Sequence, residues 1–199
     1  ETTAILPSKE WKEGRFKESW WRGDTISVGI GQGYWTATPI QIANATNILV
    51  NRGINHPPHL VQVIKKDSDI TQINNEEKPP VILKDPRHWQ VSLDAMHNTV
   101  QKISGTAHKA FKGTNYDSAG KTGTAQVVSI AQGERYDAES LKERQRDNTI
   151  YVGFAPYSDP KIVVSVVLEN NHGGIQIARQ LMDYYFAANP VNLARNETP

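Results

Sequence analysis

Residues 119–126 are the most informative segment of the chain. It reads Ala119-Gly120-Lys121-Thr122-Gly123-Thr124-Ala125-Gln126. A phosphate-binding loop would need a glycine five residues before Gly120, where Asn115 stands, so this is not a nucleotide motif. A lysine, two hydroxyl side chains and a glycine on one strand indicate instead a strand that lines a cleft.

Each residue of this strand suits the binding of an anionic, peptide-like ligand. Lys121 offers a compact cation to a carboxylate, and the hydroxyls of Thr122 and Thr124 can hydrogen-bond the same anion. Gly123 lets a substrate backbone lie close to the strand. If the strand is a sheet edge, the N–H of Thr124 can stabilise an oxyanion. Taken alone, the pattern is also compatible with a surface lysine beside a bulge glycine.

Three strands are predicted around this motif, over residues 118–128, 149–155 and 162–168. The third is nearly all β-branched, which predicts burial on both faces. Residues 157–160 read Tyr-Ser-Asp-Pro, a short turn, so the last two strands should pair as a hairpin.

Two helices are predicted before the motif. Thr38 is a good N-cap for the first, Pro39 suits its first position, and Gly53 ends it. Asp85 caps the second, and Pro86 starts it. Its apolar residues recur at spacings of 4, 3 and 4: Trp89, Leu93, Met96 and Val100.

Two helical segments complete this set. A short helical turn is predicted over residues 106–111, and a last helix over about 174–187. The buried stripe of the last helix should contain Ala178, Leu181, Met182 and Tyr185. The tail, residues 189–199, is expected to be disordered.

The remaining segments carry weaker patterns. Residues 1–24 predict an irregular surface segment with aromatic anchors, or alternatively a rim that touches a large polar substrate. Residues 25–35 predict a tight, ordered loop. Residues 59–64 predict a short strand, and residues 65–80 a loop or small hairpin. Residues 132–148 mix charges with little apolar content, which predicts a mobile, solvated excursion.

Composition excludes several classes of function. The 199 residues include 22 Lys and Arg against 21 Asp and Glu, a net charge of +1, so we expect no nucleic-acid partner. With no cysteine, neither a disulfide nor thiolate chemistry is available. No apolar run approaches the ~20 residues that span a bilayer, and no signal peptide opens the chain. A membrane anchor, if the protein has one, is expected outside this sequence.

The motifs of the chain resemble the class B penicillin-binding proteins over nearly its whole length. The resemblance is carried in family order by Gly23-Asp24-Thr25, Gly29-Ile30-Gly31-Gln32-Gly33-Tyr34-Trp35, Thr38-Pro39-Ile40-Gln41, Gly105-Thr106-Ala107, Lys121-Thr122-Gly123-Thr124-Ala125-Gln126 and Phe154-Ala155-Pro156. Lys-Thr-Gly is itself one of the signature motifs of this group.

The resemblance implies an α+β fold of the penicillin-binding transpeptidase (serine β-lactamase-like) type. In that fold a five-stranded, mainly antiparallel sheet is flanked by helices and lies beside an all-helical lobe. The three strands above would be its third, fourth and fifth. Residues 1–188 would then be the C-terminal portion of the transpeptidase domain, and residues 189–199 its tail.

The resemblance also implies a reaction and roles for the motif. In the family a serine attacks the penultimate D-Ala carbonyl of a peptidoglycan stem peptide, and an amine from a neighbouring stem takes the acyl group. By this resemblance Lys121 attracts the terminal carboxylate and bonds a motif serine. Thr122, Gly123 and Thr124 bind the substrate, and the Thr124 N–H is half of an oxyanion hole. No cofactor and no metal are expected.

The family's nucleophile does not fit any serine of this chain. One literal Ser-x-x-Lys is Ser158 to Lys161, in a predicted turn with a proline inside it. Ser92-Leu93-Asp94 fits Ser-x-Asp but lies within a helix. We therefore expect the serine motifs upstream of residue 1 and an inactive isolated chain. Two rivals stay open: a D,D-carboxypeptidase or β-lactamase, and a non-catalytic penicillin sensor.

The resemblance also implies partners and a compartment. The ligands would be stem peptides ending in D-Ala-D-Ala, and β-lactams that mimic them. The missing N-terminal part of the protein, a membrane glycosyltransferase and other elongation-complex proteins would be partners. The protein would sit in a bacterial inner membrane with this domain in the periplasm. His56 and His59 flank two prolines with no third ligand nearby, which favours loop histidines over a metal site.

Overall fold

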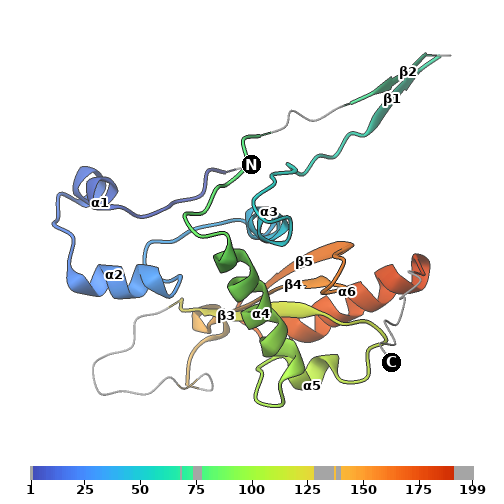
Figure 1. Cartoon of the computed structure of the whole chain (residues 1–199). Helices are drawn as coiled ribbons and strands as arrows, with labels where there is room; N and C mark the ends of the chain where they lie inside the picture. The colour runs from blue at the N-terminus through green and yellow to red at the C-terminus, as the bar shows by residue number, and fades with distance from the viewer. Residues whose placement is uncertain (1, 68, 74–77, 128–136, 138–139, 191–199) are drawn as a thin grey trace.

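The computed structural model describes residues 2–67, 69–73, 78–127, 137 and 140–190 (Figure 1). In chain order the elements are α1 (Lys9–Phe16), α2 (Arg22–Gly29), α3 (Pro39–Val50), β1 (Val63–Lys66), β2 (Asp69–Gln72), α4 (Arg87–Gln101), α5 (His108–Phe111), β3 (Ala119–Ala125), the 3₁₀ turn η1 (Glu143–Gln145), β4 (Asn148–Ala155), β5 (Ile162–Leu168) and α6 (Gly174–Ala188). Helices and antiparallel strands together confirm the predicted α+β class.

The main sheet is antiparallel with the order β3-β4-β5, which confirms the three predicted strands and the β4–β5 hairpin. Its register places Thr122 opposite Tyr151, and Tyr151 opposite Val166. Val164 and Val166 are buried, whereas the other residues of β5 are half-buried. The prediction that β5 is buried on both faces is thus only half right, because the face toward α6 is buried at Val164 and Val166 while the face toward α3 is half-buried.

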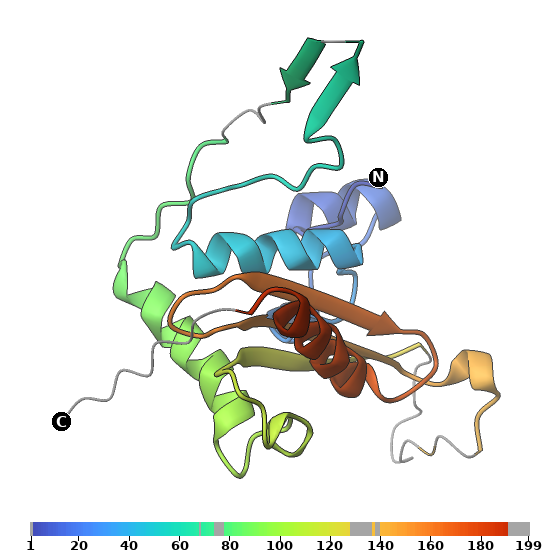
Figure 2. The same ribbon diagram turned by 90° about the vertical axis from the view of Figure 1, so that its right-hand side faces the viewer.

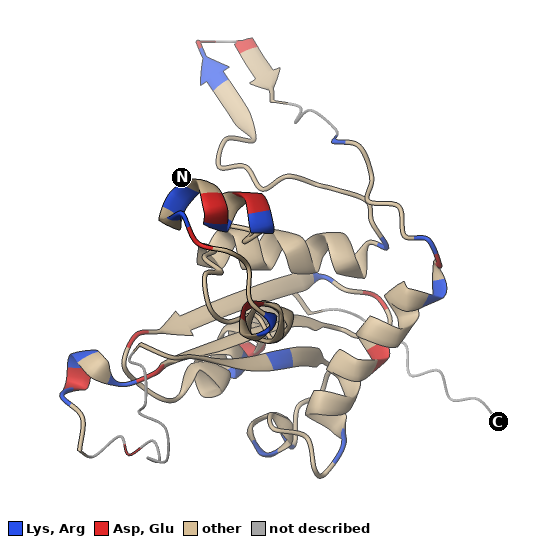
Figure 3. Ribbon diagram, turned by 90° about the vertical axis from the view of Figure 1, so that its left-hand side faces the viewer, with Lys and Arg blue, Asp and Glu red and all other residues tan. Residues whose placement is uncertain are grey.

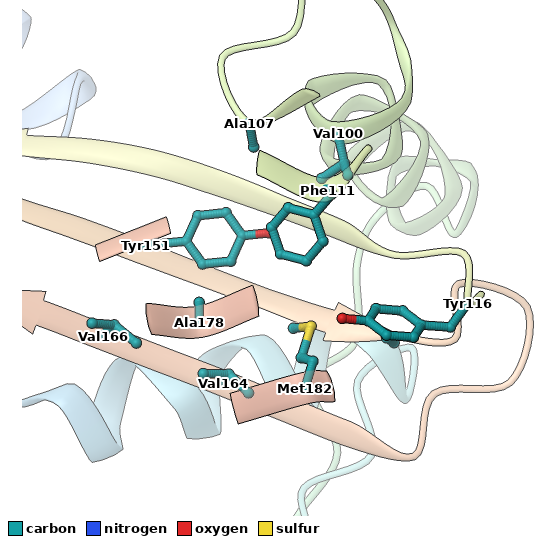
Figure 4. Packing of buried hydrophobic residues seen from close by; sticks show 10 residues of the cluster. Val100, Ala107, Phe111, Tyr116, Tyr151, Val164, Val166, Ala178 and Met182 are labelled. Carbon is teal, nitrogen blue, oxygen red and sulfur yellow. The ribbon is translucent and has the colours of Figure 1, made fainter. Parts of the chain in front are cut away.

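Helices cover both faces of the sheet. Side chains alternate along each strand, so Tyr151 and Phe154 project from opposite faces. Tyr151 belongs to a cluster with α5 and α6 that includes Met182, which is fully buried. Figure 4 shows Phe111, Tyr151 and Met182 within this cluster. Phe154 belongs to a second cluster with α3 and α4. The two clusters therefore pack against opposite faces of the sheet.

The predicted cap and start of α3 are confirmed, whereas α4 begins at Arg87, one residue after the predicted start at Pro86, and Pro86 is its N-cap. The hydroxyl of Thr38 accepts the N–H of Gln41 at 3.3 Å, and the Gln41 side chain accepts the N–H of Thr38 at 2.9 Å. Gly53 follows α3 at a φ of 100°, a conformation that favours glycine. The carboxylate of Asp85 accepts the N–H of Arg87, the first residue of α4.

The apolar faces of α4 and α6 can be compared with the predicted stripes. Leu93, Met96 and Val100 of α4 are buried as predicted. In α6, Ala178 and Met182 are buried, but Leu181 is 47% exposed, so its assignment to the stripe is wrong. The helix meets the sheet through a narrow seam of residues four apart, and Leu181 lies beside this seam.

Residues 1–35 are more regular than predicted. They form α1 and α2, so the irregular segment over residues 1–24 and the loop over 25–35 were wrong over these helices. Neither helix has a regular apolar stripe. Lys12 is 2% exposed, and its ammonium lies 2.7 Å from a carboxylate oxygen of Asp24 at the start of α2. A polar contact joins the two helices, and apolar periodicity could not reveal it.

A two-stranded hairpin, β1 and β2, extends away from the body of the molecule (Figures 1 and 2). All eight of its strand residues are exposed. The strand predicted over residues 59–64 is found at Val63–Lys66, as β1. The loop or small hairpin predicted over residues 65–80 contains β2, the second strand of the observed hairpin. Alternation of apolar and polar side chains fixes register only where one face is buried, and neither face is buried here.

Two further predictions fall partly outside the described residues. Of the predicted mobile excursion over 132–148, residues 132–136, 138 and 139 lie outside, whereas the described part contains η1 and the first residue of β4. Most of the predicted tail lies among residues 191–199. Within the described part, α6 ends as predicted beside Asn189, whose N–H donates to the carbonyl of Tyr185 at 2.9 Å.

Candidate active site

The strand β3 passes from the core to the surface. Ala119 and Gly120 are buried at its start, whereas Lys121 and Thr124 are exposed further along. β4 pairs with one side of β3, and within the described ranges no strand pairs with the other side. The motif therefore lies on a free sheet edge that is anchored at one end.

Two hydrogen bonds show which backbone groups point outward. The carbonyl of Thr124 accepts the side-chain amide of Gln32 at 3.0 Å, and the carbonyl of Thr122 accepts Nζ of Lys121 at 2.6 Å. In an extended strand the N–H and C=O of one residue point to the same side. The N–H groups of Thr122 and Thr124 consequently face the free edge, where an oxyanion donor is required.

The side chains of the motif flank this edge from two faces. Alternation places Lys121 and Gly123 on the face of Ala119, which packs against Leu93 and Met96 of α4. Thr122 and Thr124 lie on the opposite face. There the hydroxyl of Thr122 hydrogen-bonds the hydroxyl of Thr106 at 2.9 Å. A ligand lying along the edge would meet a cation from one face and hydroxyls from the other.

A tight turn after α4 positions Thr106 beneath the strand. A Cβ on Gly105 would lie 2.2 Å from the carbonyl oxygen of Thr99, so only glycine fits this close approach to α4. Ala107 is fully buried, and its N–H donates to the carbonyl of Thr99 at 3.2 Å. Gly105 and Ala107 thus fix the turn that places the hydroxyl of Thr106 beside the hydroxyl of Thr122.

A tyrosine from β4 supports the buried end of β3. A Cβ on Gly120 would lie 2.1 Å from the hydroxyl oxygen of Tyr151, and one on Gly153 would lie 2.7 Å from it. Gly120 and Gly153 are register partners, so together they leave the slot that this side chain occupies. Tyr151 is fully buried, and burial raises the pKa of its phenol. This packing fixes the backbone just before Lys121.

Sequence reasoning missed three residues of this arrangement. Gln32 and Thr106 were within motifs that carry the resemblance, but no role was assigned to them. Tyr151 carried no signal at all, because a tyrosine in a strand is ordinary core composition. The pairing of Gly120 with Gly153 is the one clue, and it becomes visible only when the register is known.

The two serine motifs that were set aside lie far from catalytic geometry. Ser158 lies in the turn between β4 and β5, and Lys161 pairs with Asp159 at 2.6 Å. Ser92 lies inside α4, where its hydroxyl donates to the carbonyl of His88 at 2.9 Å. Asp94 accepts the hydroxyl of Tyr157, which with Gln90 lowers the pKa of its carboxyl group. These contacts tie α4 to the β4–β5 turn.

Two features are absent from the part of the chain that the structure describes, a membrane-spanning helix and a metal-binding cluster. Its helices are too short or too polar to span a bilayer. The same residues contain no cluster of three or more His, Cys, Asp or Glu side chains able to hold a metal ion. Figure 3 shows Lys and Arg and Asp and Glu interspersed along the ribbon of the described residues.

Known proteins with similar sequences are peptidoglycan enzymes. Peptidoglycan D,D-transpeptidase MrdA of Haemophilus influenzae is 45% identical over 93% of this chain and 29% of its own length. MrdA of Escherichia coli K12 is 41% identical over 92% of this chain and 30% of its own length. The chain thus spans about three-tenths of the length of these curated relatives.

Known structures with a similar fold are penicillin-binding proteins. PBP2 of Pseudomonas aeruginosa, in complex with WCK 5153, superposes with a TM-score of 0.76 at 34% identity, over 94% of this chain and 39% of that one. PBP2 of Helicobacter pylori, in a complex with MreC, gives 0.75 at 25% identity, over 96% of this chain and 32% of that one. Residues 6–186 match the family described as penicillin binding protein transpeptidase domain, and the chain belongs to this family.

Proposed function

We propose that the protein containing this chain is a peptidoglycan D,D-transpeptidase and that β3 forms one wall of its substrate cleft. The observation that carries the proposal is the free edge of β3, where Lys121 and the outward N–H of Thr124 lie three residues apart on one strand. The similarity to D,D-transpeptidases over nearly the whole chain supports the same activity.

Each residue of the edge takes one role in binding a D-Ala-D-Ala terminus. The ammonium of Lys121 attracts the terminal carboxylate and bonds a serine of the helical lobe. The hydroxyls of Thr122 and Thr124 hydrogen-bond the carboxylate and the substrate backbone. Gly123 has no side chain, so the ligand backbone can approach the strand as an added partner. The N–H of Thr124 donates to the carbonyl oxygen that becomes negative during attack.

The reaction proceeds through two acyl transfers at a serine outside this chain. The serine hydroxyl attacks the penultimate D-Ala carbonyl and gives its proton to a base, and the amide bond breaks to release D-Ala as an amine. An amine of a neighbouring stem peptide then attacks the ester, a new amide forms, and the serine regains its proton. In both steps the Thr124 N–H stabilises the same oxyanion, so β3 serves acylation and deacylation alike.

The ligands and partners follow from the relatives. β-Lactams would acylate the same serine, with their carboxylate held by Lys121. The Helicobacter pylori PBP2 was solved as a complex with MreC, which supports a partner of this kind here. A membrane glycosyltransferase and other elongation-complex proteins stay predicted partners. With such partners the protein would be anchored in the inner membrane and expose this domain to the periplasm.

A variant of Lys121 in the full-length protein tests the proposal. Lys121→Ala should slow acylation by a fluorescent penicillin by about 10²-fold or more, the scale of one lost charged contact in the transition state. Lys161→Ala is the matched control, because Lys161 pairs with Asp159 in a turn and lies in the rejected Ser-x-x-Lys motif. It should acylate like the wild type. Equal rates for Lys121→Ala and the wild type would remove β3 from the site.

The isolated 199-residue chain gives a second test. The serines described here lack a lysine one helical turn later in a helix, so incubation with excess penicillin should leave the intact mass unchanged. A stoichiometric mass gain on any serine of this chain would show that the nucleophile has been misplaced.

A further inference from the structure

Gln32 joins two segments that are 92 residues apart in the sequence. Its side-chain amide donates to the carbonyl of Thr124 at 3.0 Å, across the free edge of β3. The side chain is half-buried, while Thr124 itself is exposed. The Thr124 peptide therefore has a partner on the side where β3 has no neighbouring strand in the described residues.

The loop that carries Gln32 is held in place by its own hydrogen bonds. The N–H of Gln32 donates to the carbonyl of Ser27 at 2.9 Å, which closes the end of α2. The indole N–H of Trp35 donates to the carbonyl of Val28 at 3.0 Å. Thr36 then forms a β-bridge with Ile5 through two backbone bonds. A loop fixed at both ends can hold a side chain in one orientation with little loss of entropy on binding.

The helix behind this loop is anchored in turn by the buried lysine. Lys12 bonds Asp24 at 2.7 Å, and Asp24 also accepts the N–H of Trp21. The bond to Lys12 lowers the pKa of Asp24, and the same bond raises the pKa of Lys12. The ring of Tyr34, two residues after Gln32, packs against Trp11 at 5.3 Å between centroids. The chain of contacts runs from α1 to the end of β3.

We propose that Gln32 is a positioning residue that fixes the Thr124 peptide and so keeps the oxyanion donor at the edge aimed at the substrate. An exposed strand end with one paired side can twist, and a shift below 1 Å already weakens a transition-state hydrogen bond. Gln32 supplies the missing second tether. The inference rests on the proposed function, since it assigns Gln32 to the same acyl transfer.

Acylation kinetics of the full-length protein test this role. A fluorescent penicillin in stopped flow gives the acylation rate constant and the dissociation constant of the preceding complex separately. Gln32→Glu keeps the shape of the side chain but loses the donor at neutral pH. We expect a rate constant about 10-fold lower, less than the ~10²-fold for outright loss of an oxyanion donor, because Thr124 is displaced but present. The dissociation constant should change less than about 2-fold.

A second glutamine serves as the matched control. Gln41 also donates its side-chain amide to a backbone carbonyl, that of Thr2 at 2.8 Å, but it has no contact with β3 among its hydrogen bonds. Gln41→Ala should lower the melting temperature and leave the acylation rate constant unchanged.

The acylation rate constants separate the positioning role of Gln32 from the proposed function. A Gln32→Glu protein with the wild-type rate constant overturns the positioning role and leaves the proposed function standing. An equal loss of rate in Gln41→Ala overturns it too, because the effect would then come from general destabilisation. A wild-type protein that no penicillin acylates overturns both the proposed function and the role of Gln32.

Discussion

The β3–β4–β5 sheet and the β1–β2 hairpin are built from the same kind of backbone pairing, yet they differ in everything around it. Both are antiparallel with an unbroken register. The sheet lies between two apolar clusters, whereas all eight strand residues of the hairpin are exposed. Backbone pairing alone is marginal in water, so the sheet is stable through its packing and the hairpin is the weaker element.

The difference also explains where the candidate site lies. A catalytic edge needs free backbone groups, and a free edge ordinarily frays. β3 resolves this conflict because its buried half is fixed by Tyr151 while its exposed half presents Lys121 and Thr124. The hairpin has free edges as well, but no packed half to hold them. Rigidity behind the edge therefore distinguishes the two.

The largest expected effect is the loss of a core side chain beneath the sheet. Met182 is fully buried in the cluster with α6, so Met182→Ala should lower the free energy of unfolding by about 2–5 kcal/mol. Ile70 of the hairpin is 66% exposed, and Ile70→Ala should cost less than about 0.5 kcal/mol. Urea unfolding of both variants measures the contrast. Similar losses would mean that the hairpin has its own packed core.

A smaller effect is expected from filling the slot in β3. Gly120→Ala brings a methyl group against the buried Tyr151 and should cost about 2–3 kcal/mol. Gly123→Ala is the stability control on the same strand. Its Cβ meets only Ile150, at 3.3 Å, so the cost should stay below about 1 kcal/mol. If both substitutions are tolerated alike, Tyr151 does not fix the strand.

The burial of Tyr151 should make the free energy of unfolding fall at alkaline pH. Removal of its hydroxyl should have a smaller effect at neutral pH. Its phenol has a raised pKa in the fold, so the unfolded chain loses that proton first, near pH 10. The folded protein then loses stability as pH rises above 10, by up to about 1.4 kcal/mol per pH unit for each such phenol. Tyr151→Phe should remove one such contribution and change stability at pH 7 by about 1 kcal/mol or less, since the hydroxyl has no hydrogen-bond partner among the described residues.

Thermal unfolding from pH 7 to pH 11 measures this slope. Tyr116 also has a pKa raised by burial and by its bond to Asp183, so part of the alkaline loss should survive in Tyr151→Phe. Identical slopes for the wild type and the variant would contradict the burial of Tyr151.

The same contrast explains which parts could be predicted from the sequence. β5 and α4 are in the regions that pack on a core. A run of β-branched residues marks β5 and a period of 3.6 marks α4, so the bounds of β5 and the start of α4 were found almost unchanged. α1 and α2 are joined by the ion pair of Lys12 and Asp24, and the hairpin packs on nothing, so neither leaves an apolar period.

The residues of the candidate site also fall into two groups, those that the sequence could reveal and those that it could not. Residues 121–124 were found because their chemistry is local in the sequence, and their assigned roles stay predictions until the variants are measured. The contacts of Gln32 with Thr124 and of Thr106 with Thr122 join segments 92 and 16 residues apart. Such pairs depend on how the segments are placed in three dimensions, which residue type and spacing do not encode.

The smallest effect is expected from removing the hairpin altogether. Replacing residues 63–72 with a short Gly-Ser linker deletes strand residues that are all exposed, and a longer or shorter loop changes closure entropy only slightly. The free energy of unfolding should change by less than about 0.5 kcal/mol, and penicillin acylation of the full-length protein should equal that of the wild type. A clear loss of stability would contradict this prediction.

Hydrogen exchange tests the same contrast in the unmodified protein. Amides of residues 63–66 should exchange far faster than those of residues 151–154 in the sheet centre. Slow exchange in the hairpin that is seen in the full-length protein but not in the isolated chain would show that another part of the protein covers the hairpin. The contrast with the sheet would then hold only for the isolated chain.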